Sequence, residues 1–311
     1  MSLRILFLSA AILLTFPAWA LSFQGYVQPF DHNATISWGS GDISVVRPLD
    51  VVDEGSLETL NPLSVRKAAS SARKQMLDMI MSVRIDAKRT VSAYLSEDAE
   101  LAARVRGVVQ NSPMERPAVF DDGGDVRVSE SFRGKLAELV LPTTIPFQSG
   151  IPPKLSTSME QSLSFQGDIP EEAGMGASGY TGVIIDARGM KVTPALTPVV
   201  FGQDGLGVYG AFLVSRANAI DKGILAYATS ADPSVLRERV GGRPLMIRAL
   251  STYGSWRTDL IVASPMAHLI RAIMRSSEVV NNCRLVIVID GPEPDTRDAA
   301  MIEEEQLMEE Q

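Results

Sequence analysis

Residues 142–179 divide this chain, because half of them belong to types that interrupt helices and strands. The segment contains 5 Pro, 5 Gly and 9 Ser or Thr among its 38 residues. Such a composition is typical of a linker. We therefore expect two folded blocks, residues 21–141 and residues 180–290, followed by a short tail, residues 291–311.

Residues 1–20 have the layout of a cleaved secretory signal. A basic start precedes an apolar run at residues 5–16, and the small residues Ala18 and Ala20 stand where cleavage requires them. We expect a mature protein that begins at Leu21 and is exported to the periplasm. Residue 21 is Leu and no cysteine lies nearby, so any association with the outer membrane is expected without a lipid anchor. No later apolar run is long enough to span a membrane.

Short strands and amphipathic helices share the first block. Asn61 and Pro62 start a helix, because Asn is a preferred N-cap and Pro suits the first helical position. Apolar residues then recur at spacings of three and four, which is the helical pattern. The other expected elements are strands at residues 34–38, 43–46, 105–114 and 125–132, a helix at 96–104 and an amphipathic piece at 136–141.

The second block contains several continuous apolar runs, which suit buried strands. Ser264 and Pro265 start its clearest helix. The other expected elements are strands at residues 183–185, 195–201, 207–209, 225–227, 245–250, 256–263 and 285–289, and a short helix at 233–239. Strands with interspersed helices predict the α+β class, as two small α+β domains with mixed sheets and amphipathic helices, joined by the Pro/Gly/Ser-rich linker.

The rarity of histidine and cysteine excludes several kinds of site. The chain has 2 His and 1 Cys, and one cysteine rules out an intrachain disulfide and a Cys-rich zinc site. His32 and His268 do not have metal-ligand spacing, and we interpret His268 as a half-buried packing residue. Cys283 is expected to be a small buried residue. A net charge of -8 argues against a nucleic-acid partner. We expect no cofactor and no metal.

Two motif matches have simpler explanations. Residues 205–210 match the G-x-G-x-x-G dinucleotide fingerprint, which requires a parallel strand before it and a helix after it. Pro194 and Pro198 in the preceding segment instead suit an edge strand that enters a hairpin. Residues 64–67 and 71–74 match the S-x-x-K acyl-enzyme motif, but its Lys-Thr-Gly and Ser-Asp-Asn companions do not occur in the chain. We interpret both as the basic face of an ordinary helix.

Asp186 and Arg188 are the candidate ligand or interface residues. Asp186 directly follows a buried strand, a position where carboxylates often serve as ligands or bases. The alternative is a local ion pair within a turn, with Gly189 at a positive φ. Neither interpretation favours catalysis, and no catalytic residue is predicted.

Five segments together resemble a family of bacterial envelope proteins. They are a helix rich in Ala and Arg at residues 66–77, a strand at 105–109, and the runs at 180–189, 194–198 and 204–210. The pattern is similar to the LPP-type outer-membrane lipoproteins and the FlgP/FlgT-type envelope proteins associated with flagellar assembly. The resemblance implies small α+β modules that assemble into rings or disks around the flagellar motor near the outer membrane. It implies no catalytic residues, and the lipidated cysteine is missing from this chain.

The favoured hypothesis is a non-enzymatic exported envelope protein with a structural or assembly role, one version being a part of a flagellar ring or disk. Its expected partners are further copies of itself or other envelope proteins, with flagellar motor components or peptidoglycan among the candidates. The alternatives are a periplasmic module that binds the cell wall or another envelope protein, and a periplasmic hydrolase.

The negative charge is concentrated in the tail. Residues 290–311 hold nine acidic side chains and one arginine, so the rest of the mature chain is close to neutral. A nearly neutral folded part suits protein–protein packing better than capture of a charged substrate. The tail itself is expected to be a solvated end or a contact for a basic partner.

Overall fold

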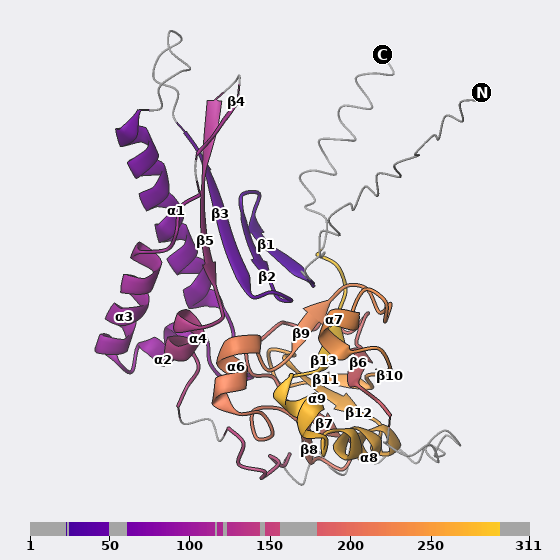
Figure 1. Ribbon diagram of the computed structural model, residues 1–311. Helices are drawn as coiled ribbons and strands as arrows, with labels where there is room; N and C mark the ends of the chain where they lie inside the picture. The colour runs from indigo at the N-terminus through magenta and orange to yellow at the C-terminus, as the bar shows by residue number, and fades with distance from the viewer. Residues whose placement is uncertain are drawn as a thin grey trace, which may run out of the picture.

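The computed structural model describes residues 23, 25–49, 61–115, 117–120, 123–143, 147–155 and 179–292 (Figure 1). They form a first half, residues 25–143, and a second half, residues 179–292, with residues 147–155 attached to the second half. The expected signal, the larger part of the expected linker and the tail beyond residue 292 lie outside the described residues.

The first half is an antiparallel sheet with helices on one face (Figure 1). The strand order is β1-β2-β3-β5-β4, and β3 and β5 form its longest pairing. Helix α1 packs on these two strands. The strands are β1 (Val27–Asp31), β2 (Ala34–Ser37), β3 (Asp42–Pro48), β4 (Ala118–Phe120) and β5 (Gly123–Ser131), and the helices are α1 (Pro62–Ser82), α2 (Val91–Leu95), α3 (Ala99–Gln110) and α4 (Lys135–Val140).

Helix α1 confirms the start predicted from the sequence. The Asn61 side chain accepts a hydrogen bond from the Leu63 N–H, and Pro62 occupies the first turn. The buried face repeats at intervals of three and four residues, as the apolar spacing predicts. Its members are Ala68, Ala69, Ala72, Met76, Met79 and Ile80.

The predicted strand at residues 105–114 is wrong, because most of this segment belongs to helix α3. Asp98 caps the helix by accepting the Leu101 N–H at 2.9 Å. Ala102, Val105 and Val108 follow on one buried face. Valine favours strands on average, but packing of this face on the core outweighs that preference.

Two four-stranded sheets make up the second half. One is parallel throughout, in the order β10-β6-β13-β9, and the other is mixed, in the order β11-β12-β7-β8. The α+β prediction is therefore confirmed. The strands are β6 (Gly182–Asp186), β7 (Val200–Gly202), β8 (Gly207–Tyr209), β9 (Ala226–Ala228), β10 (Pro244–Arg248), β11 (Ser251–Tyr253), β12 (Asp259–Val262) and β13 (Leu285–Val288), and the helices are α6 (Arg216–Lys222), α7 (Arg237–Val240), α8 (Ser264–Ile273) and α9 (Ser277–Asn281).

The expected edge strand at residues 195–201 is a second correction. Regular pairing starts only at Val200, after Pro194 and Pro198, because proline cannot donate to a ladder. Strand β7 then lies between β12 and β8 rather than at the edge. The antiparallel pairing of β7 with β8 confirms the predicted hairpin.

One hydrophobic core runs through both halves. A single cluster of buried residues extends from Ala34 in β2 to Ile289 after β13. The Trp38 and Tyr227 rings meet edge to face across the boundary, with centroids 5.6 Å apart at 77°. The Tyr26 N–H donates to the Tyr227 carbonyl at 2.7 Å. The halves are therefore packed as one unit rather than tethered by a linker alone.

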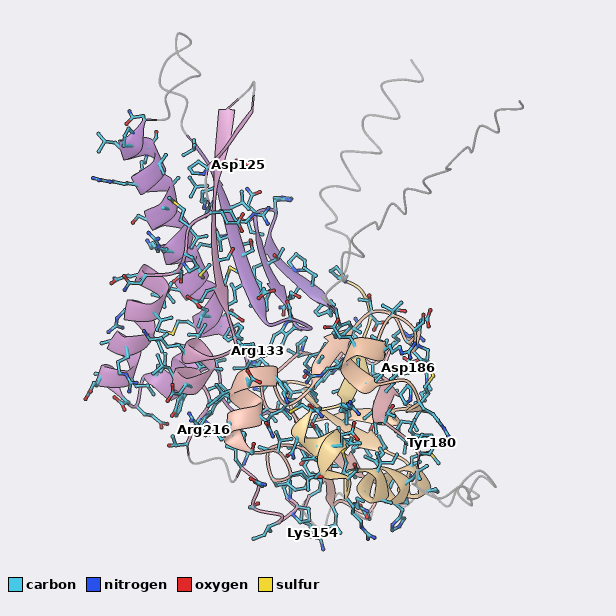
Figure 2. The ribbon with its side chains drawn as sticks, viewed as in Figure 1. Asp125, Arg133, Lys154, Tyr180, Asp186 and Arg216 are labelled. Atoms are coloured by element: carbon cyan, nitrogen blue, oxygen red, sulfur yellow. The ribbon has the colours of Figure 1, made fainter. Side chains whose placement is uncertain are left out.

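Polar contacts across the boundary add to this packing. The Arg216 guanidinium donates to the carbonyls of Glu138 and Leu141 at 2.6 and 3.1 Å. Arg133 and Arg216 both lie where the two halves meet in Figure 2. On the far side, the Thr197 hydroxyl donates to the Ile85 carbonyl at 2.7 Å.

Residues 147–155, which we call the strap, cross the surface of the second half. The Gln148 and Gly150 N–H groups donate to the Ala211 and Phe212 carbonyls, each at 2.9 Å. The Leu155 N–H donates to the Gly205 carbonyl at 2.8 Å. This part of the expected linker is therefore held in place by backbone hydrogen bonds.

Candidate binding site

Asp186 and Arg188 form the ion pair that the sequence offered as one alternative. The Arg188 Nε and a terminal nitrogen donate to the two Asp186 carboxylate oxygens at 2.9 and 2.7 Å. The hydrogen bond from Arg188 lowers the pKa of Asp186. Gly189 follows with φ at 83°. The pair therefore completes a tight turn after β6.

The same edge of the parallel sheet holds a second acid and a second base. The Gly189 N–H donates to the Asp290 carboxylate at 2.9 Å, and Arg248 lies 4.0 Å from Asp186. Two carboxylates and two guanidinium groups thus meet at the carboxyl ends of β6, β10 and β13. They balance one another, so this edge shows no surplus charge for a ligand.

The other residues singled out from the sequence lie apart from each other. His268 is exposed on α8, which makes the prediction of a half-buried histidine wrong. Its neighbours Ala267 and Ile270 take the buried face instead. Cys283 is buried, as expected. Lys67 and Lys74 are exposed on α1, on the face opposite the core.

A cavity with a volume of about 900 Å³ lies beside the strap. The strap forms one wall through residues 149–155, and the loop at residues 86–89 forms another. Its floor comes from the mixed sheet. Apolar and aromatic side chains dominate the lining, including Ile151, Leu155, Val199, Phe201, Phe212 and Tyr253. An open, largely apolar cavity of this size is typical of a binding site for a small ligand or a peptide side chain.

Asp259 places one carboxyl group in this apolar cavity. The residue is 6% exposed and starts strand β12. Burial raises the pKa of Asp259 to about 6, although hydrogen bonds from the Val199 N–H and the Thr258 hydroxyl favour the charged form. Repulsion from Asp86 contributes in the same direction as burial. The group therefore changes its protonation state close to neutral pH.

The loop at residues 86–89 is held rigidly against the cavity. The Asp86 carboxylate accepts the N–H groups of Lys88 and Arg89 at 2.8 and 2.9 Å. The Leu196 N–H donates to the Arg84 carbonyl at 3.0 Å, which ties the loop to the second half. The Arg84 guanidinium also stacks 3.2 Å above the Trp256 ring. Both halves therefore contribute to the cavity walls.

Sequence reasoning missed Asp259 as a site residue. Its one visible signal is an acidic side chain at the start of an apolar run, Asp259–Val262, inside a strand. The residues that bury it, Val199 and the strap, come from distant parts of the chain. A single sequence does not show that they converge.

Asp259 gives the cavity a group that can make a hydrogen bond in either protonation state. When protonated, the Asp259 carboxyl can donate a hydrogen bond to an apolar ligand, and when ionised it can accept one from a cationic nitrogen. The lining residues include no His or Cys. Among the described residues, no three His, Cys, Asp or Glu side chains are grouped closely enough to hold a metal ion.

Comparison with known proteins gives a partial match. Residues 182–291 match a family model described as the second domain of Tp0624 from Treponema pallidum. The match extends from β6 past β13, so it includes both sheets of the second half but neither the first half nor the strap. No curated protein matches the chain. In the part of the chain that is described, no helix has the length and apolar character needed to cross a membrane.

Proposed function

We propose that this chain is a non-enzymatic, exported envelope protein that acts by binding an apolar group of another envelope component in the cavity beside the strap. The observation that carries the proposal is a cavity of about 900 Å³ with apolar walls and one buried carboxyl group, Asp259. Cavities that combine apolar walls with a few converging polar groups of perturbed pKa are the usual form of binding sites.

The side chains around the cavity support a binding role over hydrolysis. The Thr197 hydroxyl donates to the Ile85 carbonyl at 2.7 Å. The Ser149 hydroxyl accepts the Ile151 N–H at 3.2 Å. Neither hydroxyl has a histidine beside it among the lining residues. A nucleophile needs an adjacent general base, so these contacts do not favour a periplasmic hydrolase.

A bulky side chain that fills the cavity is expected to abolish most of the binding of an apolar ligand there. The probe is 1-N-phenylnaphthylamine, an apolar dye with one N–H donor, titrated while its fluorescence is recorded. In the Val199→Trp variant the indole occupies ligand space, and we expect the Kd for the dye to rise by about tenfold or more. Val235 is exposed and outside the cavity, so Val235→Trp is the matched control. Equal dye affinity in the two variants would contradict the proposal.

A second candidate function, self-assembly, is favoured by the open edge of the parallel sheet. Strand β10 is at that edge, and Met246 within it is 49% exposed. Unpaired edge strands with apolar side chains are templates for strand pairing between chains. A place in a flagellar ring is the finer form of this candidate and rests on the sequence resemblance. A deletion strain that swims normally would contradict that finer form.

A positive charge on strand β10 is expected to weaken the association of copies of this chain. Met246→Lys places a cation on β10, and paired copies would bring two such cations together. We expect the weight-average mass from light scattering of residues 21–311 to fall towards that of the monomer. Leu63→Lys, at an exposed position on α1, is the control. A wild-type protein that stays monomeric at every concentration would exclude this candidate.

A further inference from the structure

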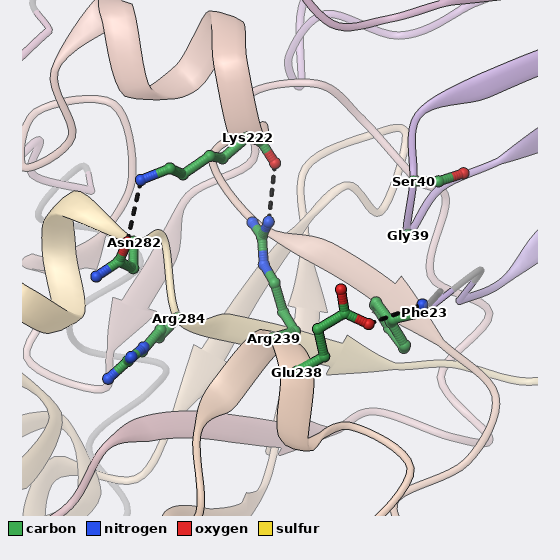
Figure 3. A pocket seen from close by; sticks show the side chains of 8 residues that line it. All are labelled: Phe23, Gly39, Ser40, Lys222, Glu238, Arg239, Asn282 and Arg284. Atoms are coloured by element: carbon green, nitrogen blue, oxygen red, sulfur yellow. Dashed lines mark hydrogen bonds between the residues drawn. The ribbon is translucent and has the colours of Figure 1, made fainter. Parts of the chain in front are cut away.

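A second, polar pocket lies where the two halves meet, and it is separate from the cavity beside the strap. Its volume is about 340 Å³. Lys222, Arg239 and Arg284 come from the second half, while Gly39 and Ser40 come from the turn between β2 and β3 of the first half. Figure 3 shows the Lys222 ammonium turned towards Asn282 and the Arg239 guanidinium turned towards the Lys222 carbonyl, while Arg284 points away from both.

Arg239 carries a positive charge that the described residues do not neutralise. Its guanidinium donates to the carbonyls of Lys222 and Gly223 at 2.8 and 2.9 Å. Its Nε–H is buried and has no hydrogen-bond partner. Burial lowers the pKa of Arg239, so the charged form is held at a cost. Among the described residues, Arg239 forms no ion pair with a carboxylate.

Arg133 adds a second such charge just behind the pocket. It donates to the Phe132 carbonyl at 3.0 Å and, more weakly, towards the Gly39 carbonyl at 3.5 Å. Burial and the charge of Arg239 lower the pKa of Arg133 to about 10. The carboxylates of Asp42 and Asp221 act in the opposite direction and offset this lowering of the Arg133 pKa only in part.

The other two cations of the lining are only partly compensated. The Lys222 ammonium donates to the Asn281 carbonyl and the Asn282 side-chain oxygen, each at 3.0 Å, and both acceptors are neutral. Arg284 pairs with Glu278 at 2.8 Å, but the Glu278 side chain is 69% exposed. Glu238 is the one acid in the lining, and it accepts the Phe23 N–H at 3.1 Å. With the Glu278 partner of Arg284 counted, three cations face two carboxylates, which leaves a surplus of one positive charge.

We propose that this pocket binds a phosphate monoester group, with Lys222, Arg239 and Arg284 as its donors. A phosphate monoester carries close to two negative charges near neutral pH and is attracted by a lining with a net positive charge. Its terminal oxygens can each accept from a cationic donor, and the three cationic side chains of the lining come from α6, α7 and the segment between α9 and β13.

The position of the pocket gives the bound group a contact with each half. Gly39 and Ser40 belong to the first half, whereas the three cations belong to the second. A dianion placed between them would bridge the boundary next to Arg133. Binding is therefore expected to raise the melting temperature of the whole protein, because a ligand that binds only the folded state stabilises it.

The test is calorimetric titration of residues 21–311 with inorganic phosphate and with glycerol 3-phosphate, against sodium chloride at matched ionic strength. Sedimentation with vesicles containing phosphatidic acid identifies a lipid as the source of the same chemical group. Lys222→Gln and Arg284→Gln are the informative variants, since Arg239 also holds two backbone carbonyls in place. We expect the Kd for phosphate to rise by about tenfold or more in each variant.

The matched control is Arg237→Gln, which removes an exposed guanidinium from α7 outside the pocket. It is expected to leave phosphate affinity unchanged. Two results would overturn the proposal. One is the absence of saturable phosphate binding by the wild-type protein in the millimolar range. The other is an equal affinity for phosphate in Lys222→Gln, Arg284→Gln and Arg237→Gln. An equal loss in Arg237→Gln would do so as well, because it would reduce the effect to general charge.

Discussion

Replacing Trp38 with alanine is expected to lower the free energy of unfolding of the whole protein by about 3–5 kcal/mol. The Trp38 side chain is 7% exposed, and its ring packs against Tyr227 in the second half. Its Nε1–H donates to the Gln28 side chain at 2.8 Å. The variant therefore loses apolar burial, an aromatic pair and a hydrogen bond at the boundary between the halves.

Urea denaturation of residues 21–311 measures this effect. Far-UV circular dichroism follows the secondary structure of both halves, while tryptophan fluorescence reports on Trp38 in the first half and Trp256 in the second. We expect both signals of the wild-type protein to change in one shared transition, because the core is continuous. Trp256→Ala is the control, since that ring is 47% exposed and should cost about 1 kcal/mol through its contact with Arg84. Separate transitions, or a Trp38→Ala effect no larger than the control, would contradict the shared core.

We expect the free energy of unfolding of the wild-type protein to fall as pH rises, because Asp259 ionises. Replacing Asp259 with asparagine is expected to abolish this pH dependence. Burial raises the folded-state pKa of Asp259 to about 6 from its ordinary value of 3.8. Between these values the folded state binds more protons than the unfolded state. The stabilisation is therefore fully present below about pH 4 and is lost as pH rises through about 6. Its size is at most about 3 kcal/mol, because each pKa unit corresponds to about 1.4 kcal/mol.

Thermal or urea unfolding at pH 4, 5, 6 and 7 tests this expectation. Asparagine keeps an oxygen that can accept the Val199 N–H, so the fold is expected to persist in the variant. Asp186→Asn provides a contrast of opposite sign. Its carboxylate has a lowered pKa beside Arg188, so its stabilisation is present above the ordinary pKa and is lost in acid. A wild-type profile parallel to that of Asp259→Asn would show that Asp259 does not titrate in this range.

Local sequence signals predicted the elements whose ends and faces are set by nearby residues. Asn61 and Pro62 mark the start of α1 because a cap acts on the following turn alone. The strand predicted at residues 105–114 was wrong, because valine and Gly107 obscure the helical spacing of the apolar residues. That spacing becomes clear only from their packing on the core. Helix α6 was not expected, although Ser215 caps it by accepting the Asn218 N–H at 3.1 Å.

The candidate sites also differ in whether neighbouring residues or distant ones determine them. The pairing of Asp186 with Arg188 and the positive φ of Gly189 follow from three neighbouring residues, and the sequence offered both. The raised pKa of Asp259 results from its burial and, to a smaller extent, from the charge of Asp86 in the first half. The surplus positive charge around Arg239 likewise arises from three separate elements. Chemistry that depends on such convergence is absent from any local pattern.

The core shared between the halves also sets an order of events during synthesis. A chain that emerges from its amino-terminus makes Trp38 and Tyr26 long before Tyr227, the residue that covers both. The first half alone leaves that apolar surface uncovered, and contacts between residues so far apart in sequence slow folding. Strand β9, which carries Tyr227, pairs with β13, so nascent chains that lack β13 (Leu285–Val288) should remain sensitive to protease and be ready targets for chaperones. Completion of the sheet that contains β9 is the step that ends this vulnerable period.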